Sequence, residues 1–242
     1  MVGLVIVSLL LGGLGVAIAL LARSSFKQWR LILDTPTSKC GGAQAGLIEL
    51  KGVARADSEA VLTSPLTNQR CVYYRVHVEE YVRRGNKSRW TTRVSDVQTV
   101  PTVLDDGSGR AKVDLTKATL ELQRDRHEKQ SAFEGLPPEV KAFIESKYQL
   151  STKGLLLNRP LRVTETALAV NDDLYVLGRA EWRGKDLHVV PFEKIFVASD
   201  KPEEEVAASS RNSFLGLSAL ALFFLGMLAV FSIGPIRAWL GR

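Results

Sequence analysis

The stretch Cys71–Val82, CVYYRVHVEEYV, decides the fold class of this chain. Apolar and polar side chains alternate along it, and a period of two is typical of a strand that turns one face toward a core. We expect the core face to carry Val72, Tyr74, Val76, Val78 and Val82. The opposite face then carries Cys71, Tyr73, Arg75, His77, Glu79 and Tyr81. The sequence therefore predicts a β-sheet domain organised around this strand.

A basic hairpin tip, Arg83–Arg89, follows this strand, and a return strand is predicted from Trp90 to Val103. One interpretation of the tip is a turn whose charges are simply solvated. The other is contact with anionic lipid headgroups, where each basic residue near a charged surface contributes about 1 kcal/mol. The candidate contacts to lipid or to a partner are Arg83, Arg84, Lys87, Arg89 and Arg93.

Further strands and turns lie on both sides of this hairpin. Strands are predicted at Gly46–Ala54, Ala111–Asp114, Leu161–Leu168, Asp173–Glu181, Leu187–Val190 and Ile195–Ala198. Turns are predicted at Asp34–Ser38, Ser64–Gln69 and Asp105–Gly109. One soluble helix is predicted to begin at Leu136–Glu139, because proline suits a first helical turn. Residues 34–200 are therefore predicted to form a mostly β domain, a small barrel or sandwich with one short helix.

The two ends of the chain are free of charge. Neither Val2–Ala22 nor Phe214–Ile233 contains a charged residue, and all Lys and Arg except Arg237 and Arg242 lie between the two runs. A run of about 20 apolar residues matches the thickness of a bilayer, where a charge is costly. The prediction is a transmembrane helix at each end, over residues 2–22 and 214–233. A juxtamembrane segment (23–33), a polar linker (201–213) and a short tail (234–242) complete the division.

Three further properties of these ends bear on the prediction. The first run could be a cleaved signal peptide with Ala17–Ala19 as its small-residue site, but it lacks a basic n-region and is longer than usual. More basic residues flank the spans on the domain side than on the other, which favours a two-pass protein with a cytoplasmic domain.

The first span contains small residues spaced four residues apart, Gly13 with Ala17 and Gly15 with Ala19. This spacing suits packing on the second span or on another copy of the chain, the alternative being a lone lipid-facing helix.

Composition argues against several kinds of site. A net charge of +6 in 242 residues is too mild to predict a nucleic-acid partner. Cys40 and Cys71 are the only cysteines, so they cannot build a zinc site alone, and they either form one disulfide or remain reduced thiols. His77 beside Glu79 could form an acid–base pair, but a polar cross-strand surface is the interpretation we favour for both. We predict no catalytic residue, no metal ligand and no cofactor.

Several short motifs lie along the predicted domain. They are G-x-x-E-x-x-G at 46–52, S-P-L-T-x-x-x-C-V-Y-Y-R at 64–75, D-D-G-S-G at 105–109, E-x-x-L at 165–168 and D-L-Y-V-L-G at 173–178. Together they resemble the GIDE domain, a domain found between two membrane spans. Asn68 stands where the family often has glycine, a substitution that the left-handed region tolerates. The family-motif residues are Pro65, Leu66, Cys71, Tyr73, Tyr74, Arg75, Gly107, Gly109, Tyr175 and Gly178.

The resemblance implies a membrane protein related to a mitochondrial outer-membrane E3 ubiquitin ligase and to many prokaryotic proteins. The ligase also carries a RING finger, which needs about eight Cys and His ligands for two zinc ions. No Cys follows Cys71 here, so we expect a RING-less member. The expected function is a membrane-anchored interaction or scaffold protein without catalysis of its own. The alternative is a ligase-like component that acts with a separate catalytic chain. The expected partners are the bilayer and another membrane protein, by resemblance a LemA-like one.

Overall fold

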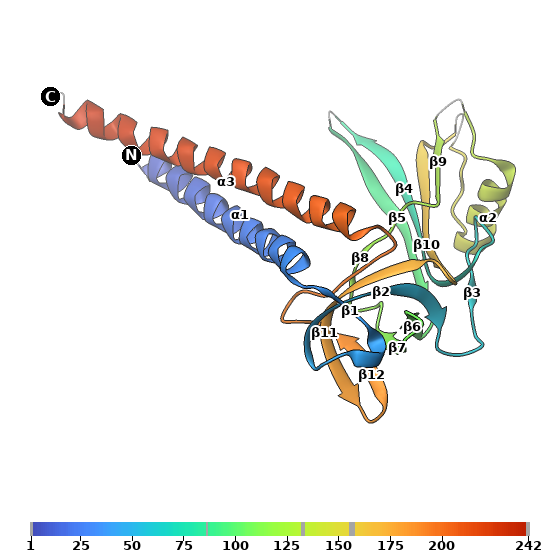
Figure 1. Cartoon of the computed structure of the whole chain (residues 1–242). Coiled ribbons are helices and arrows are strands. Elements are labelled where there is room, and N and C mark those ends of the chain that lie inside the picture. The colour runs from blue at the N-terminus through green and yellow to red at the C-terminus, as the bar shows by residue number, and fades with distance from the viewer. Residues whose placement is uncertain (1, 86, 132–133, 155–157, 241–242) are drawn as a thin grey trace. The chain divides into compact units, whose positions relative to one another are not determined.

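The structure, a computed structural model, describes residues 2–85, 87–131, 134–154 and 158–240, with side chains except at 2, 4, 5, 84 and 231–240. The chain forms two compact units. One consists of Met1–Pro36 with Pro202–Arg242, and the other is Thr37–Lys201. Figure 1 shows the helices of the first unit and the strands of the second.

The first unit is a pair of long helices, α1 (Val2–Asp34) and α3 (Glu203–Leu240). Both are long and apolar enough to cross a membrane, over Ile6–Asp34 and Glu203–Val230. They therefore extend the predicted spans through the juxtamembrane segment and most of the predicted polar linker. No Gly or Pro interrupts either extension, and a helix that has begun adds further residues at little cost.

The two helices pack on one another, and Figure 1 shows them side by side. A Cβ atom added to Gly15 would lie 3.2 Å from the Leu225 side chain, and one added to Gly12 would lie 3.2 Å from Leu228. A Cβ at Gly13 meets nothing within 4 Å. Gly15 thus lies against α3 as the small-residue spacing predicts, whereas Gly13 points elsewhere and Gly12 takes its place.

The second unit is built around a closed β-barrel. Strands pair in the ring β2–β6–β7–β12–β11 and back to β2, and only the β7–β12 pairing in this ring is parallel. The bounds are β2 Gly46–Ala56, β6 Thr102–Asp105, β7 Arg110–Val113, β11 Asp173–Arg183 and β12 Asp186–Val190. This five-stranded ring is the architecture of OB-fold barrels, a likeness of fold that by itself says nothing of function.

Three short strands extend the barrel sheet. They are β1 (Thr37–Ser38) beside β2, β13 (Val197–Ser199) beside β11, and β8 (Thr119–Glu121) beside β13. The turn predicted at Asp34–Ser38 is therefore partly wrong, because α1 continues to Asp34 and the last two residues pair as a strand. The barrel encloses a core of buried aliphatic residues that includes Leu50, Leu104, Leu174 and Val176.

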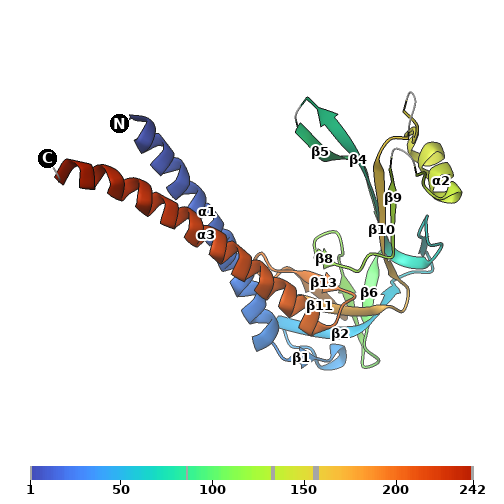
Figure 2. The same ribbon diagram turned by 90° about the horizontal axis from the view of Figure 1, so that it is seen from above.

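A second sheet stands beside the barrel. It contains β3 (Leu62–Thr63), β4 (Arg70–Arg84), β5 (Lys87–Thr99), β10 (Leu161–Ala169) and β9 (Arg126–Gln130). The single soluble helix, α2 (Pro138–Tyr148), covers one face of this sheet, as Figure 2 shows. Val140 and Ile144 of α2 are fully buried and belong to the same core as Val76 and Val78 of β4. The predicted mostly β domain with one short helix is confirmed.

Strand β4 contributes to both cores, and this corrects the predicted faces. Tyr73 pairs with Leu168 and Cys71 with Ala169, so Val72 is an extra residue that bulges from the ladder. Beyond a bulge the alternation changes face. Val72 and Tyr73 therefore lie in the barrel core, whereas Cys71 and Tyr74 lie in the core under α2.

The return strand is also divided. Residues Lys87–Thr99 form β5 of the second sheet, whereas Thr102–Asp105 form β6 of the barrel. Pro101 lies between them, and proline cannot donate a ladder hydrogen bond. The predicted continuous strand from Trp90 to Val103 is therefore wrong at this point.

The predicted left-handed conformation of Asn68 is confirmed by its φ of 56°.

Candidate functional site

Two buried carboxylates lie within the family motifs, and both hold the fold. Glu165 is fully buried and accepts hydrogen bonds from the backbone N–H of Leu66 at 2.7 Å and of Thr67 at 3.0 Å. Glu49 is also fully buried and accepts hydrogen bonds from the Thr37 hydroxyl at 2.6 Å and the Tyr175 hydroxyl at 3.0 Å. A buried carboxylate is tolerated only when such donors replace its water. These residues therefore serve structure.

The D-D-G-S-G motif forms the predicted turn. Gly107 has a φ of 77°, the left-handed region that favours glycine. The Asp106 carboxylate accepts hydrogen bonds from the N–H groups of Ser108 and Gly109 and, at 2.9 Å, from that of Cys40. Partial burial alone would raise the pKa of Asp106, but these hydrogen bonds bring it below its usual value. The turn thus fastens the segment before β2 to the barrel.

The two cysteines are free thiols in different cores. Cys40 is buried in the barrel core and Cys71 in the core under α2. Burial, followed by the charge of Asp106, raises the pKa of Cys40 to about 12. Burial, followed by the charge of Glu165, raises the pKa of Cys71 to about 11. Of the two alternatives, the structure supports reduced and unreactive thiols.

Most of the remaining motif residues are also packed inside the fold. Leu66, Tyr73, Tyr74 and Tyr175 are buried. A Cβ on Gly178 would lie 2.7 Å from the carbonyl oxygen of Val190, so the motif glycine permits a close approach of two strands. The exception is Arg75, whose side chain is exposed on the uncovered face of the second sheet.

The basic hairpin tip exists, but its residues divide between two faces. The strands reverse between Arg84 and Lys87, and the Arg84 side chain lies outside the described ones. Lys87, Arg89 and Arg93 border one shallow depression. Arg83 belongs to the opposite face of the ribbon, because it pairs with Ser88 in the alternating ladder. Arg93 lies inside β5 and is ion-paired with Glu80 at 2.6 Å, so it is no part of the tip.

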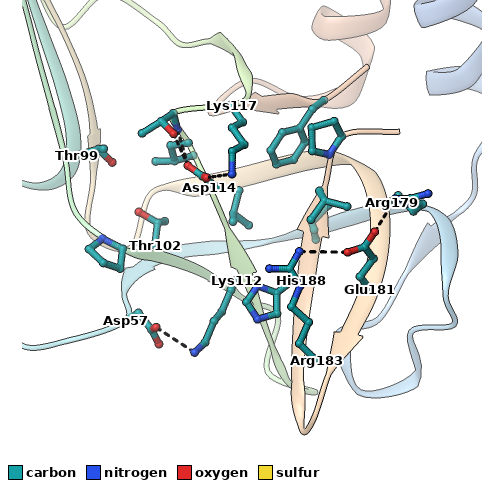
Figure 3. Close-up of a pocket in the computed structure, with 18 of the residues that line it drawn as sticks. Asp57, Thr99, Thr102, Lys112, Asp114, Lys117, Arg179, Glu181, Arg183 and His188 are labelled. Carbon is teal, nitrogen blue, oxygen red and sulfur yellow. Dashed lines mark hydrogen bonds and ion pairs between the residues drawn. The ribbon is translucent and has the colours of Figure 1, made fainter. Parts of the chain in front are cut away.

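A groove of about 640 Å³ lies on the outer wall of the barrel, and sequence reasoning missed it. Figure 3 shows residues of β7, β11 and β12 around it, with Lys112, His188 and Glu181 on neighbouring strands. Its apolar lining includes Val100, Pro101, Leu115, Val190, Pro191 and Phe196. In the sequence, the strand residues of the groove are visible only as polar side chains at every second position, on the outward side of the predicted strands. That signal marks any solvated strand, so it could not single out a groove.

The charges of the groove are paired with one another, as the dashed lines of Figure 3 show. The Lys112 ammonium lies 3.0 Å from Asp186 and 3.4 Å from Asp57, contacts that raise the pKa of Lys112. Lys117 lies 2.8 Å from Asp114 and, together with Thr116, lowers the pKa of that carboxyl.

A third group of paired charges lies on β11. Glu181 accepts from Arg179 at 2.6 Å and from Arg183 at 3.2 Å, and the two guanidinium groups, that of Arg183 first, lower the pKa of the carboxyl. The groove therefore has an apolar floor and a rim of matched charges.

An apolar floor inside a rim of paired charges can accommodate a segment of another protein. Apolar centres with polar rims are the usual anatomy of protein interfaces. In the described part of the chain, His188 has no hydrogen bond to a hydroxyl or thiol that could act as a nucleophile. Among the same residues no three His, Cys, Asp or Glu side chains are grouped to hold a metal ion.

Comparison with protein-family models gives a match over most of the domain. The family model GIDE, described as E3 Ubiquitin ligase, matches residues 73–231, from strand β4 into helix α3. Neither the curated proteins nor the solved structures that were compared contain a match to the chain. The matched region covers well over half of the sequence and carries the Tyr73–Arg75, D-D-G-S-G and D-L-Y-V-L-G motifs. The chain belongs to the GIDE family.

Proposed function

We propose that this protein is a membrane-anchored interaction or scaffold protein whose barrel groove binds a segment of a partner. The observation that carries the proposal is the groove itself, where an apolar floor lies inside a rim of ion pairs. Because the rim charges are already neutralised by one another, an apolar segment can enter without leaving an unpaired charge behind.

The two apolar helices supply the anchor in this proposal. Each is long enough to span a bilayer, which supports our proposal of a two-pass integral membrane protein. The excess of basic residues beside the spans, including Arg23, Lys27, Arg30 and Arg211, favours a cytoplasmic domain. Fusing a reporter of sidedness to either terminus tests this orientation, since both ends then lie opposite the domain.

The family description also supports a second function, a ligase-like component that acts with a separate catalytic chain. The sequence has two cysteines and three histidines, too few for the two zinc ions of a RING finger. Ubiquitin transfer by the purified chain with an activating and a conjugating enzyme separates the two proposals. Transfer that depends on this chain alone would refute the scaffold proposal, whereas transfer that needs a third protein would support the second function.

The partner that we propose is another membrane protein, and the family resemblance suggests a LemA-like one. Val190 offers a sharp test, because it is half-buried in the groove at an outward position of β12. Val190→Arg places an unpaired charge on the apolar floor without entering the barrel core. Co-purification of the LemA-like protein from membranes should fall roughly tenfold, the effect of losing an apolar anchor.

The matched control is Val97→Arg on β5, since Val97 is 47% exposed and lies outside the groove. Binding should be unchanged in this variant, and both variants should unfold at the temperature of the unmodified chain. Equal loss of the partner in the two variants would refute the groove as the contact surface.

We also propose that the hairpin tip contacts anionic lipid headgroups. Its support is the exposure of Arg83, Lys87 and Arg89 at the end of a ribbon that extends past the sheet in Figures 1 and 2. Exposed cations lose little hydration free energy when they approach a headgroup layer, because they remain solvated there.

A further inference from the structure

The face of the second sheet that α2 leaves uncovered carries a depression of about 390 Å³. Strands β4, β10 and β9 form its floor, and the register places Thr164 of β10 between His77 and His127. Four cations and two histidines line the depression, which we call the two-histidine basin: Arg75, Arg124, Lys129, Arg162, His77 and His127.

The charges of the basin are unbalanced. Glu79 is the one carboxylate that lines it, and Arg162 already holds that carboxylate in an ion pair. Within the residues that the structure describes, Arg75, Arg124 and Lys129 have no acidic partner. The barrel groove differs, because each of its cations lies beside a carboxylate. Unmatched cations gathered in one depression attract an anion from outside the chain.

The neighbouring cations affect the pKa of both histidines. His127 Nδ1 lies 2.9 Å from the Thr164 hydroxyl, within hydrogen-bonding distance. Burial lowers the pKa of His127, and the charges of Lys129 and Arg124 lower it further. Burial also lowers the pKa of His77, where Arg75 and Arg162 add to the effect and Glu79 opposes it. Both shifts favour the neutral imidazole, and an anion bound beside the rings would oppose them.

The geometry points to a binding site for a phosphate-bearing anion, with a phosphomonoester or diphosphate group seated in the two-histidine basin. Such a group carries about two negative charges and several acceptor oxygens, which match several unpaired donors at once. Arg75 offers a planar fork for two of those oxygens, and the hydroxyls of Thr164 and Thr166 line the floor. A lipid headgroup and a soluble phosphate compound present the same group.

Calorimetry with sodium pyrophosphate tests the site on the full chain in nanodiscs of uncharged lipid. One-site binding is expected, together with a rise in the pKa of His77 and His127 in the proton NMR titration of the rings. Arg75→Gln with Lys129→Gln should weaken binding by roughly tenfold or more, the effect of losing charge-assisted hydrogen bonds. Arg75→Lys with Lys129→Arg keeps both charges but loses the fork at position 75, so it should weaken binding less than the glutamine pair does.

The matched control is Arg70→Gln with Lys185→Gln, which removes two exposed cations outside the basin. Arg70 lies on the same strand as Arg75, so this pair also controls for changes in β4. Affinity should be nearly unchanged. Equal weakening by the control and the basin variant would overturn the inference, because it would show attraction by overall charge rather than by the basin.

A second arm distinguishes the sources of the phosphate group. Nanodiscs that contain phosphatidic acid should shift the two histidine titrations without added pyrophosphate if the ligand is a lipid headgroup. If pyrophosphate alone shifts them, the ligand is soluble. If neither shifts them, the inference is wrong. Val190→Arg leaves the basin intact, so failure of the groove proposal and failure of this one are separate results.

Discussion

Glu165 joins two segments that lie 99 residues apart, because its carboxylate accepts a 2.7 Å hydrogen bond from the backbone N–H of Leu66. The second carboxylate oxygen accepts from both the N–H and the hydroxyl of Thr67. The loop between β3 and β4 is thus fixed to β10 by one side chain. Pro65 and Leu66, two of the family-motif residues, lie in this loop.

We expect Glu165→Ala to lower the free energy of unfolding by about 3 kcal/mol, since it leaves buried amide donors without an acceptor. Urea unfolding of the detergent-solubilised chain, followed by circular dichroism, measures the change. Glu59→Ala removes an exposed carboxylate and should change stability by less than about 0.5 kcal/mol. Similar stabilities for the two variants would contradict the structural role of Glu165.

Gly178→Ala should destabilise the barrel. The added methyl group would lie 2.7 Å from the Val190 carbonyl oxygen and 2.8 Å from the Val189 side chain, so β11 and β12 must separate. Overpacking of this kind costs about 1–3 kcal/mol. Gly42→Ala is the control, because a Cβ there meets nothing within 4 Å. The melting temperatures of the two variants decide the matter, and a Gly178 variant as stable as the control would count against the barrel register.

The raised pKa values of Cys40 and Cys71 predict a loss of stability in alkali. In the folded chain the thiols hold their protons up to about pH 12 and 11, whereas in the unfolded chain they release them near pH 9. Folding therefore binds protons above pH 9, and the free energy of unfolding falls as pH rises through that range. Replacing both cysteines with alanine should make that fall shallower.

The same thiols should resist alkylation at pH 8 in the native chain and react quickly once it is unfolded. Mass spectrometry of iodoacetamide-treated samples, with and without denaturant, measures this difference. Rapid labelling of the native chain would show that the cores around Cys40 and Cys71 open readily.

Gly15 and Gly13 should respond differently to substitution by leucine. Gly15→Leu inserts a side chain where a Cβ atom alone would lie 3.2 Å from Leu225 of α3, so it should weaken the α1–α3 contact, whereas Gly13→Leu should not. Cross-linking between cysteines engineered into the two helices measures the contact. If Gly13→Leu instead reduces cross-linking between copies of the chain, its open side binds a second copy, which is the homo-oligomer that the small-residue spacing suggests.

Removing the charges of the hairpin tip should abolish its contact with the headgroup layer without altering the stability of the protein. A fluorophore attached to the thiol of a Ser88→Cys variant, at the position that pairs with Arg83 in the ribbon, reports contact with the headgroup layer. Its emission should shift to the blue in nanodiscs with anionic lipid, and added salt should reverse the shift because charges are screened within about 10 Å. Changing Arg83, Arg84, Lys87 and Arg89 to serine should abolish the shift and leave the melting temperature nearly unchanged. Identical spectra in anionic and neutral nanodiscs would refute the lipid contact.

Local patterns were sufficient to predict most elements but not their assembly. The alternation in Cys71–Val82 correctly predicted a strand, yet it could not reveal the bulge at Val72, because an extra residue between two apolar positions leaves no mark in the pattern. Strand β9, RHEKQ, was missed because it is polar throughout and its pairing depends on β10.

The candidate sites were harder to predict than the fold. The two-histidine basin combines residues from three strands, and only the register brings His127 within reach of Thr164. Glu49 and Glu165 appear in the sequence as ordinary polar positions of a strand, and their burial depends on donors that lie far away along the chain. Charge runs such as Arg83–Arg89 are visible in the sequence, but the division of their side chains between two faces is not.

The bulge at Val72 makes the barrel and the second sheet mechanically inseparable. The Val72 carbonyl accepts hydrogen bonds from the Val100 N–H at 3.0 Å and from the Thr99 hydroxyl at 3.1 Å, at the point where β5 gives way to the barrel. Neither core can unfold without breaking this shared crossing. We therefore expect residues Thr37–Lys201 to unfold as one cooperative unit, with the amide protons around Val72 among the slowest to exchange.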